Sequence, residues 1–146
     1  MEPSVPDTAV LLAAAPDSGP VLSRMLCDVA RPIVAYSVEE ALRLLDPGID
    51  LVICTLRFDE SRMLEFLAQA TRDIPRLRWI CCRVLESDLP ESSLDAARVA
   101  ALNLGALAFI DVPALRARQG AEAAAESFRN VVRKHLAAAM AAKNAA

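Results

Sequence analysis

The sequence has few aromatic residues, a single histidine and no long apolar segment. Aromatic side chains make up 4% of the 146 residues and hydrophobic residues 55%, so a folded core must be built from Leu, Val, Ile and Ala. No apolar stretch reaches the roughly 18–20 residues that span a bilayer. The first residues are acidic and contain proline, unlike the basic start of a signal peptide. We therefore expect a cytoplasmic protein that does not enter a membrane.

Cysteine and histidine are too scattered to suggest a metal site. The four cysteines follow no zinc or disulfide spacing, and we interpret them as buried, reduced thiols: Cys27, Cys54, Cys81 and Cys82. The single histidine, His135, falls in the last helical segment, where a solvated side chain is the expected role. No glycine-rich phosphate loop is present either, so we expect neither a metal nor a cofactor.

The charge is unevenly distributed along the chain. The net charge is −3, but residues 114–146 carry six basic and two acidic side chains, a net of +4, so the remainder carries −7. Such a split can mark a basic contact surface. The low pI of about 5.2 and the absence of aromatic residues among the basic ones argue against nucleic acid as a partner.

Strand-like and helix-like segments alternate along the chain. The central one, 49–56, is apolar at nearly every position, which is typical of a parallel strand buried on both faces. The other strand-like segments are 8–15, 33–36, 77–84 and 107–112, and the last helix lies within 114–142. This pattern predicts a single α/β domain of (βα)5 type over 1–146, with a loose start (1–7), the fold itself (8–140) and a tail (141–146).

Two segments resemble the receiver domain of bacterial two-component response regulators. Asp50-Leu51-Val52-Ile53-Cys54-Thr55-Leu56 is similar to the family's third strand, commonly D-L-V-L-L-D-L. Residues 103–113, which include Gly105-Ala106 and Pro113, are similar to the family's A-G-A-D-D-Y-L-V-K-P. The resemblance covers about residues 8–140. It implies a flavodoxin-like, doubly wound parallel sheet with strand order 2-1-3-4-5.

The resemblance also implies where a phosphorylation site would lie. In the family, a carboxylate on the third strand accepts the phosphoryl group, and two acids after the first strand hold Mg²⁺. A hydroxyl group ending the fourth strand and a lysine ending the fifth bind the phosphoryl oxygens. The matching positions hold none of these groups: Thr55 at the acceptor, Ala14 and Ala15 at the acids, Arg83 at the hydroxyl and Val112 at the lysine. We therefore expect a degenerate domain that is neither phosphorylated nor an enzyme.

The function implied by the resemblance is regulation through protein contacts. The partner would be a protein of a bacterial signalling pathway, bound by the fourth helix, fifth strand and last helix. The same face could form a homodimer, and on the last helix we expect Val132, Leu136 and Met140 to contribute to it.

Two alternatives remain open at the degenerate crevice. Arg57 and Arg83 could bind a small anion or a nucleotide there. Arg83 could instead fill the vacated space and pair with Asp59, Glu86 or Asp111.

Overall fold

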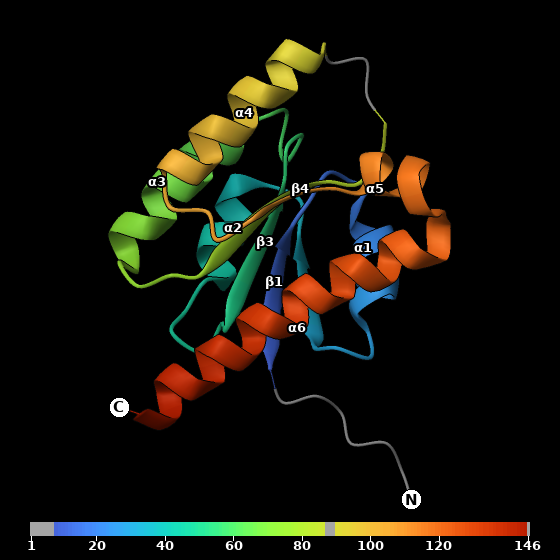
Figure 1. Ribbon diagram of the computed structural model, residues 1–146. Coiled ribbons are helices and arrows are strands. Elements are labelled where there is room, and N and C mark those ends of the chain that lie inside the picture. The colour runs from blue at the N-terminus through green and yellow to red at the C-terminus, as the bar shows by residue number, and fades with distance from the viewer. Residues whose placement is uncertain (1–7, 87–89, 146) are drawn as a thin grey trace, which may run out of the picture.

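A computed structural model describes residues 8–86 and 90–145, which form five parallel strands and six helices (Figure 1). The strands are β1 (Ala9–Ala13), β2 (Arg31–Ala35), β3 (Leu51–Thr55), β4 (Trp79–Arg83) and β5 (Phe109–Asp111). The helices are α1 (Gly19–Leu26), α2 (Val38–Leu44), α3 (Met63–Asp73), α4 (Glu91–Asn103), α5 (Val112–Gln119) and α6 (Ala121–Ala145). The sheet order is β2-β1-β3-β4-β5, which confirms the predicted fold class and topology.

The sheet is buried on both sides because alternate strand residues enter two separate cores. One core joins the sheet to α1 and α6, with Leu22 and Phe128 among its fully buried members. The other joins it to α2, α3 and α4, through Ala41, Phe66 and Ala101. In Figure 1, α6 crosses the first face diagonally and ends beyond the start of β3. None of the helices within the described residues is long and apolar enough to cross a membrane.

The segment after β5 differs from the prediction because it contains two helices. Helix α5 begins directly at Val112, where the Asp111 side chain accepts a hydrogen bond from the Ala114 amide and caps the helix. Gly120 then turns the chain with φ of 87°, a conformation that favours glycine, and α6 follows. Val112 therefore lies in a helix rather than on the strand. The predicted tail is helical as far as Ala145, whereas the predicted loose start lies outside the described residues.

The contact residues expected on the last helix are mostly used by the core. Val132 and Leu136 are buried on the sheet, so only Met140, with 38% of its surface exposed, could meet a partner. On α4, by contrast, Leu102 is exposed. Periodicity identifies an apolar side of a helix, but it does not tell whether the sheet or the solvent lies against that side.

Three of the four predicted buried thiols are buried. Cys54 and Cys81 share one core and Cys82 enters the other, whereas Cys27 is exposed at the end of α1. Burial raises the pKa of Cys81 to about 12. It also raises the pKa values of the Cys54 and Cys82 thiols well above the usual value for cysteine. These three thiols therefore stay protonated and are poor nucleophiles.

Candidate functional site

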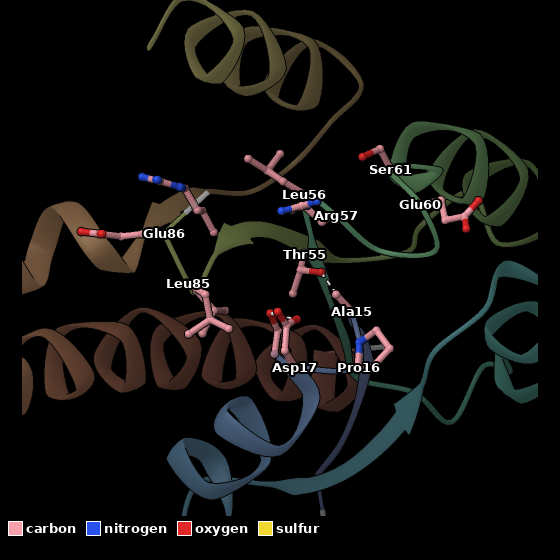
Figure 2. A pocket seen from close by; sticks show the side chains of 13 residues that line it. Ala15, Pro16, Asp17, Thr55, Leu56, Arg57, Glu60, Ser61, Leu85 and Glu86 are labelled. Atoms are coloured by element: carbon pink, nitrogen blue, oxygen red, sulfur yellow. Dashed lines mark hydrogen bonds between the residues drawn. The ribbon is translucent and has the colours of Figure 1, made fainter. Parts of the chain in front are cut away.

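The carboxyl ends of β1, β3 and β4 open into a crevice of about 530 Å³ (Figure 2). It lies where ligands bind in open parallel α/β sheets, at the point where the strand order reverses. The loops after the three strands line it, and Thr55 stands near its centre with Asp17 on one side and Arg57 on the other. This is the site that the resemblance to receiver domains predicts to be degenerate.

Thr55 holds two strands together at the acceptor position. Its hydroxyl oxygen accepts a hydrogen bond from the Ala15 amide at 3.2 Å, and the side chain is only 3% exposed. Ala14 and Ala15 are buried after β1 and offer no side-chain oxygen. The described residues that line the crevice include no histidine that could activate the Thr55 hydroxyl. The side chains at these three positions therefore serve packing and strand pairing.

Arg83 forms an ion pair with Asp111 on the neighbouring strand. The two residues are register partners of β4 and β5, and an Arg83 guanidinium nitrogen lies 3.3 Å from an Asp111 carboxylate oxygen. Their side chains are 14% and 27% exposed. Of the three acids considered as partners, this geometry selects Asp111, whose carboxylate also caps α5. The Arg83 Nε is buried and has no hydrogen-bond partner among the described residues.

Val112, at the position of the family's lysine, is buried in the core shared with α1 and α6. No side chain from the end of β5 thus supplies the cation that would bind a phosphoryl group. Across residues 8–86 and 90–145, there is also no group of three His, Cys, Asp or Glu side chains placed to hold a metal ion.

The charges of the crevice do not favour an anion. Arg57 is exposed at its wall, but the second cation, Arg83, is already paired with Asp111. Three carboxylates line the same space: Asp17, Glu60 and Glu86. An anion entering here would meet more negative than positive side chains.

The amides at the start of α1 are also occupied. The Ser18 and Gly19 amides both donate to the Ala15 carbonyl at 3.0 Å, so neither is free to bind an anion. Ser18 begins the helix without a side-chain cap.

The loop after β3 contains a turn that the sequence did not reveal. Asp59, Glu60 and Ser61 have φ of 45°, 54° and 68°, in the left-handed region that side chains other than glycine disfavour. The Asp59 carboxylate accepts hydrogen bonds from the Val38 amide (2.8 Å) and the Arg62 guanidinium (3.0 Å). The bond to Val38 spans 21 positions and, with the local bond to Arg62, holds the turn at the rim of the crevice.

A second depression lies between α4, the outer edge of β5 and the helices that follow. Its volume is about 640 Å³, and Leu94, Phe109 and Leu115 contribute its apolar part. Next to it, α4 buries only Ala101 fully. Four large apolar residues on α4 and on the segment leading to β5 are each at least 39% exposed: Val99, Leu102, Leu104 and Leu107.

The fold is similar to that of solved bacterial receiver domains. The match to a signal receiver domain from Vibrio parahaemolyticus covers 94% of this chain and 96% of that domain, with a TM-score of 0.71 and 16% sequence identity. The match to a response regulator receiver protein from Pseudoalteromonas atlantica covers 93% of this chain and 98% of that protein, with a TM-score of 0.63 and 15% sequence identity. The match to the non-phosphorylated HemR receiver domain of Leptospira biflexa covers 71% of this chain and 81% of that domain, with a TM-score of 0.57 and 22% sequence identity. No family model matches the sequence, and the comparison with curated proteins finds no match either.

Proposed function

We propose that this chain is a receiver-like signalling module that acts through protein contacts and does not depend on phosphorylation. The observation that carries the proposal is the Thr55–Ala15 hydrogen bond, because it gives the acceptor position a structural role. The lack of oxygen ligands at Ala14 and Ala15 adds to it, since Mg²⁺ requires such ligands. The module would be non-catalytic and would serve a protein partner in a bacterial signalling pathway.

The contact surface would be centred on α4 and the chain leading into β5. Val99, Leu102, Leu104 and Leu107 form an apolar surface that the fold does not bury. Self-association through this surface would produce a homodimer, and a different partner could bind the same residues. On α6, only Met140 remains available from the surface predicted by the sequence.

Binding of a small anion or nucleotide in the crevice remains the alternative function. Arg57 is the cation that would support it. The three carboxylates in the crevice and the pairing of Arg83 with Asp111 weigh against it.

Incubation with acetyl phosphate or beryllofluoride in the presence of Mg²⁺ tests independence from phosphorylation. Intact mass and amide spectra should stay unchanged, because neither the acceptor carboxylate nor the acids that hold the metal are present. A stoichiometric phosphorylated species, stable or labile, would contradict the proposal.

Sedimentation equilibrium at micromolar concentration tests the contact surface. If the wild type dimerises, Leu102→Glu should weaken the dimer by about tenfold or more, because a charge would enter an apolar interface. Leu64→Glu is the matched control, since Leu64 is similarly exposed but lies on α3. Val132→Glu is unsuitable because Val132 is buried. A strictly monomeric wild type would rule out the dimer at these concentrations.

A further inference from the structure

A second, separate groove lies at the amino ends of β3 and β4, at the end of the sheet opposite the crevice. It has a volume of about 340 Å³ and lies between the last turns of α6 and the loops that precede β3 and β4. Its apolar lining is formed by Pro47, Ile49, Ile74, Leu77, Ala139 and Ala142. The final turns of α6 thus form one wall of a recess.

Two arginines of this groove have no acidic partner. Lys143 bonds the carboxylate of Asp50, which also accepts a hydrogen bond from the Ala9 amide at 2.9 Å. Arg76 and Arg78 line the groove as well, and no acid among the described residues lies within ion-pair distance of either. This leaves two uncompensated positive charges on a protein whose net charge is −3.

The acids closest in sequence to this edge are engaged elsewhere. Asp46 accepts a hydrogen bond from the Gly48 amide, and Asp73 accepts one from the Gln69 side chain. Neither carboxylate forms a direct ion pair with Arg76 or Arg78 among the described residues.

His135, on the neighbouring part of α6, lies in the same positively charged environment. Its pKa is lowered first by partial burial and then by the positive charges of Lys134 and Arg78. The imidazole is therefore neutral at physiological pH and does not add to the charge.

We propose that this groove binds an acidic segment of a partner protein, in which carboxylate side chains alternate with apolar ones. The apolar side chains would cover Ile49, Leu77 and Ala142, and the carboxylates would meet Arg76 and Arg78. Arginine binds a carboxylate in a bidentate manner, and two arginines two positions apart suit carboxylates on alternate residues of an extended chain. The groove is remote from α4, so this site does not rest on the function proposed above.

The form of the site favours a protein segment over a membrane or a nucleic acid. Lys143 is turned toward Asp50, and the remaining cations flank a recess with an apolar lining. A bilayer surface or a phosphate backbone is bound by several projecting cations spread over a wider area.

Fluorescence anisotropy with a labelled Glu-Leu-Glu-Leu-Glu peptide tests the proposal. The peptide should bind at least about tenfold more tightly than versions with Gln for Glu or Ser for Leu, and more weakly at higher salt. The double variant Arg76→Glu/Arg78→Glu should lose at least about tenfold in affinity, and Ala142→Trp should do so by filling the groove. Arg24→Glu/Arg116→Glu is the matched control, because it changes the charge equally at exposed arginines elsewhere.

Two further measurements make the result decisive. Amide chemical shifts of the wild type should move at Ile49, Leu77 and Ala142 on titration with the peptide, while those at Val99 and Leu104 should not. Thermal melts should show that the variants remain folded. Equal affinity of the Arg76/Arg78 variant and the wild type would overturn the proposal. So would binding of phosphatidylserine vesicles or single-stranded DNA through these arginines without binding of the peptide.

Discussion

The two ends of β3 are fastened to β1 in the same way but with different chemistry. Just before the strand, the Asp50 carboxylate accepts a hydrogen bond from the Ala9 amide at 2.9 Å. At its last residue, the Thr55 hydroxyl accepts one from the Ala15 amide at 3.2 Å. Both residues are almost completely buried, 7% and 3% exposed, but only Asp50 carries a charge.

The difference between the two ends follows from what surrounds each acceptor. A buried carboxylate needs a cation or several donors, and Lys143 reaches Asp50 from the end of α6. Among the residues that the structure describes, no cation bonds Thr55, which stands where the resembling family would use a carboxylate together with Mg²⁺. A neutral hydroxyl satisfies the buried amide without any counter-charge. The charged acceptor thus lies at the end where Lys143 can compensate it, and the neutral acceptor lies at the crevice.

The largest expected effect comes from removing the charged acceptor. Asp50→Ala leaves the Ala9 amide and Lys143 without their partner, so we expect a loss of about 3 kcal/mol in the free energy of unfolding. Urea denaturation followed by circular dichroism measures it. Asp50→Asn is the control, because it keeps an acceptor for Ala9 and should lose less. If the alanine variant were as stable as the wild type, Asp50 would not anchor this edge.

The same experiment at the neutral end should give a smaller loss. Thr55→Val keeps the shape of the side chain and removes the oxygen that accepts from Ala15, for which we expect about 1.5 kcal/mol. Thr55→Ser retains the hydroxyl group and should recover part of this loss. A valine variant that loses as much as Asp50→Ala would remove the contrast between the ends.

The sequence predicted the sheet and the position of the crevice, but not the contacts that distinguish the two ends of β3. The apolar run of β3 and the alternation of strands and helices were sufficient for the fold and, with the resemblance, for the strand order. Asp50 and Lys143 are 93 positions apart, so no local pattern connects them. Their contact depends on the path of α6 across the sheet.

Local signals did exist for the helix break that the prediction missed. Asp111 followed by Pro113 is a typical helix start, and Gly120 is a typical residue just beyond a helix end. The resemblance placed Val112 at the end of a strand instead. The outward side of α4 and the inward side of α6 could not be assigned, because both helices carry apolar residues at helical spacing.

The turn beyond Thr55 offers a change of opposite sign. Ser61→Gly removes a side chain from a left-handed position, where we expect a gain of about 0.7 kcal/mol in stability after the greater freedom of unfolded glycine is subtracted. Ser92→Gly, in the first turn of α4, is the matched control and should lose about 0.5 kcal/mol. Chemical denaturation of both variants gives the comparison. A loss at both positions would show that the turn is not strained.

The smallest expected effect belongs to the lysine that compensates Asp50. Lys143 is half exposed, so solvent weakens its attraction to the carboxylate, and Lys143→Met should lose only about 0.5 kcal/mol. The methionine keeps most of the apolar stem, which separates the charge from packing. A double-mutant cycle with Asp50→Asn isolates the pair, and its coupling energy should shrink as salt is added. If no coupling were found at low salt, the Ala9 hydrogen bond alone would hold this end of β3. The two ends of the strand would then differ only in the side chain that accepts the hydrogen bond from β1 or the residues after it.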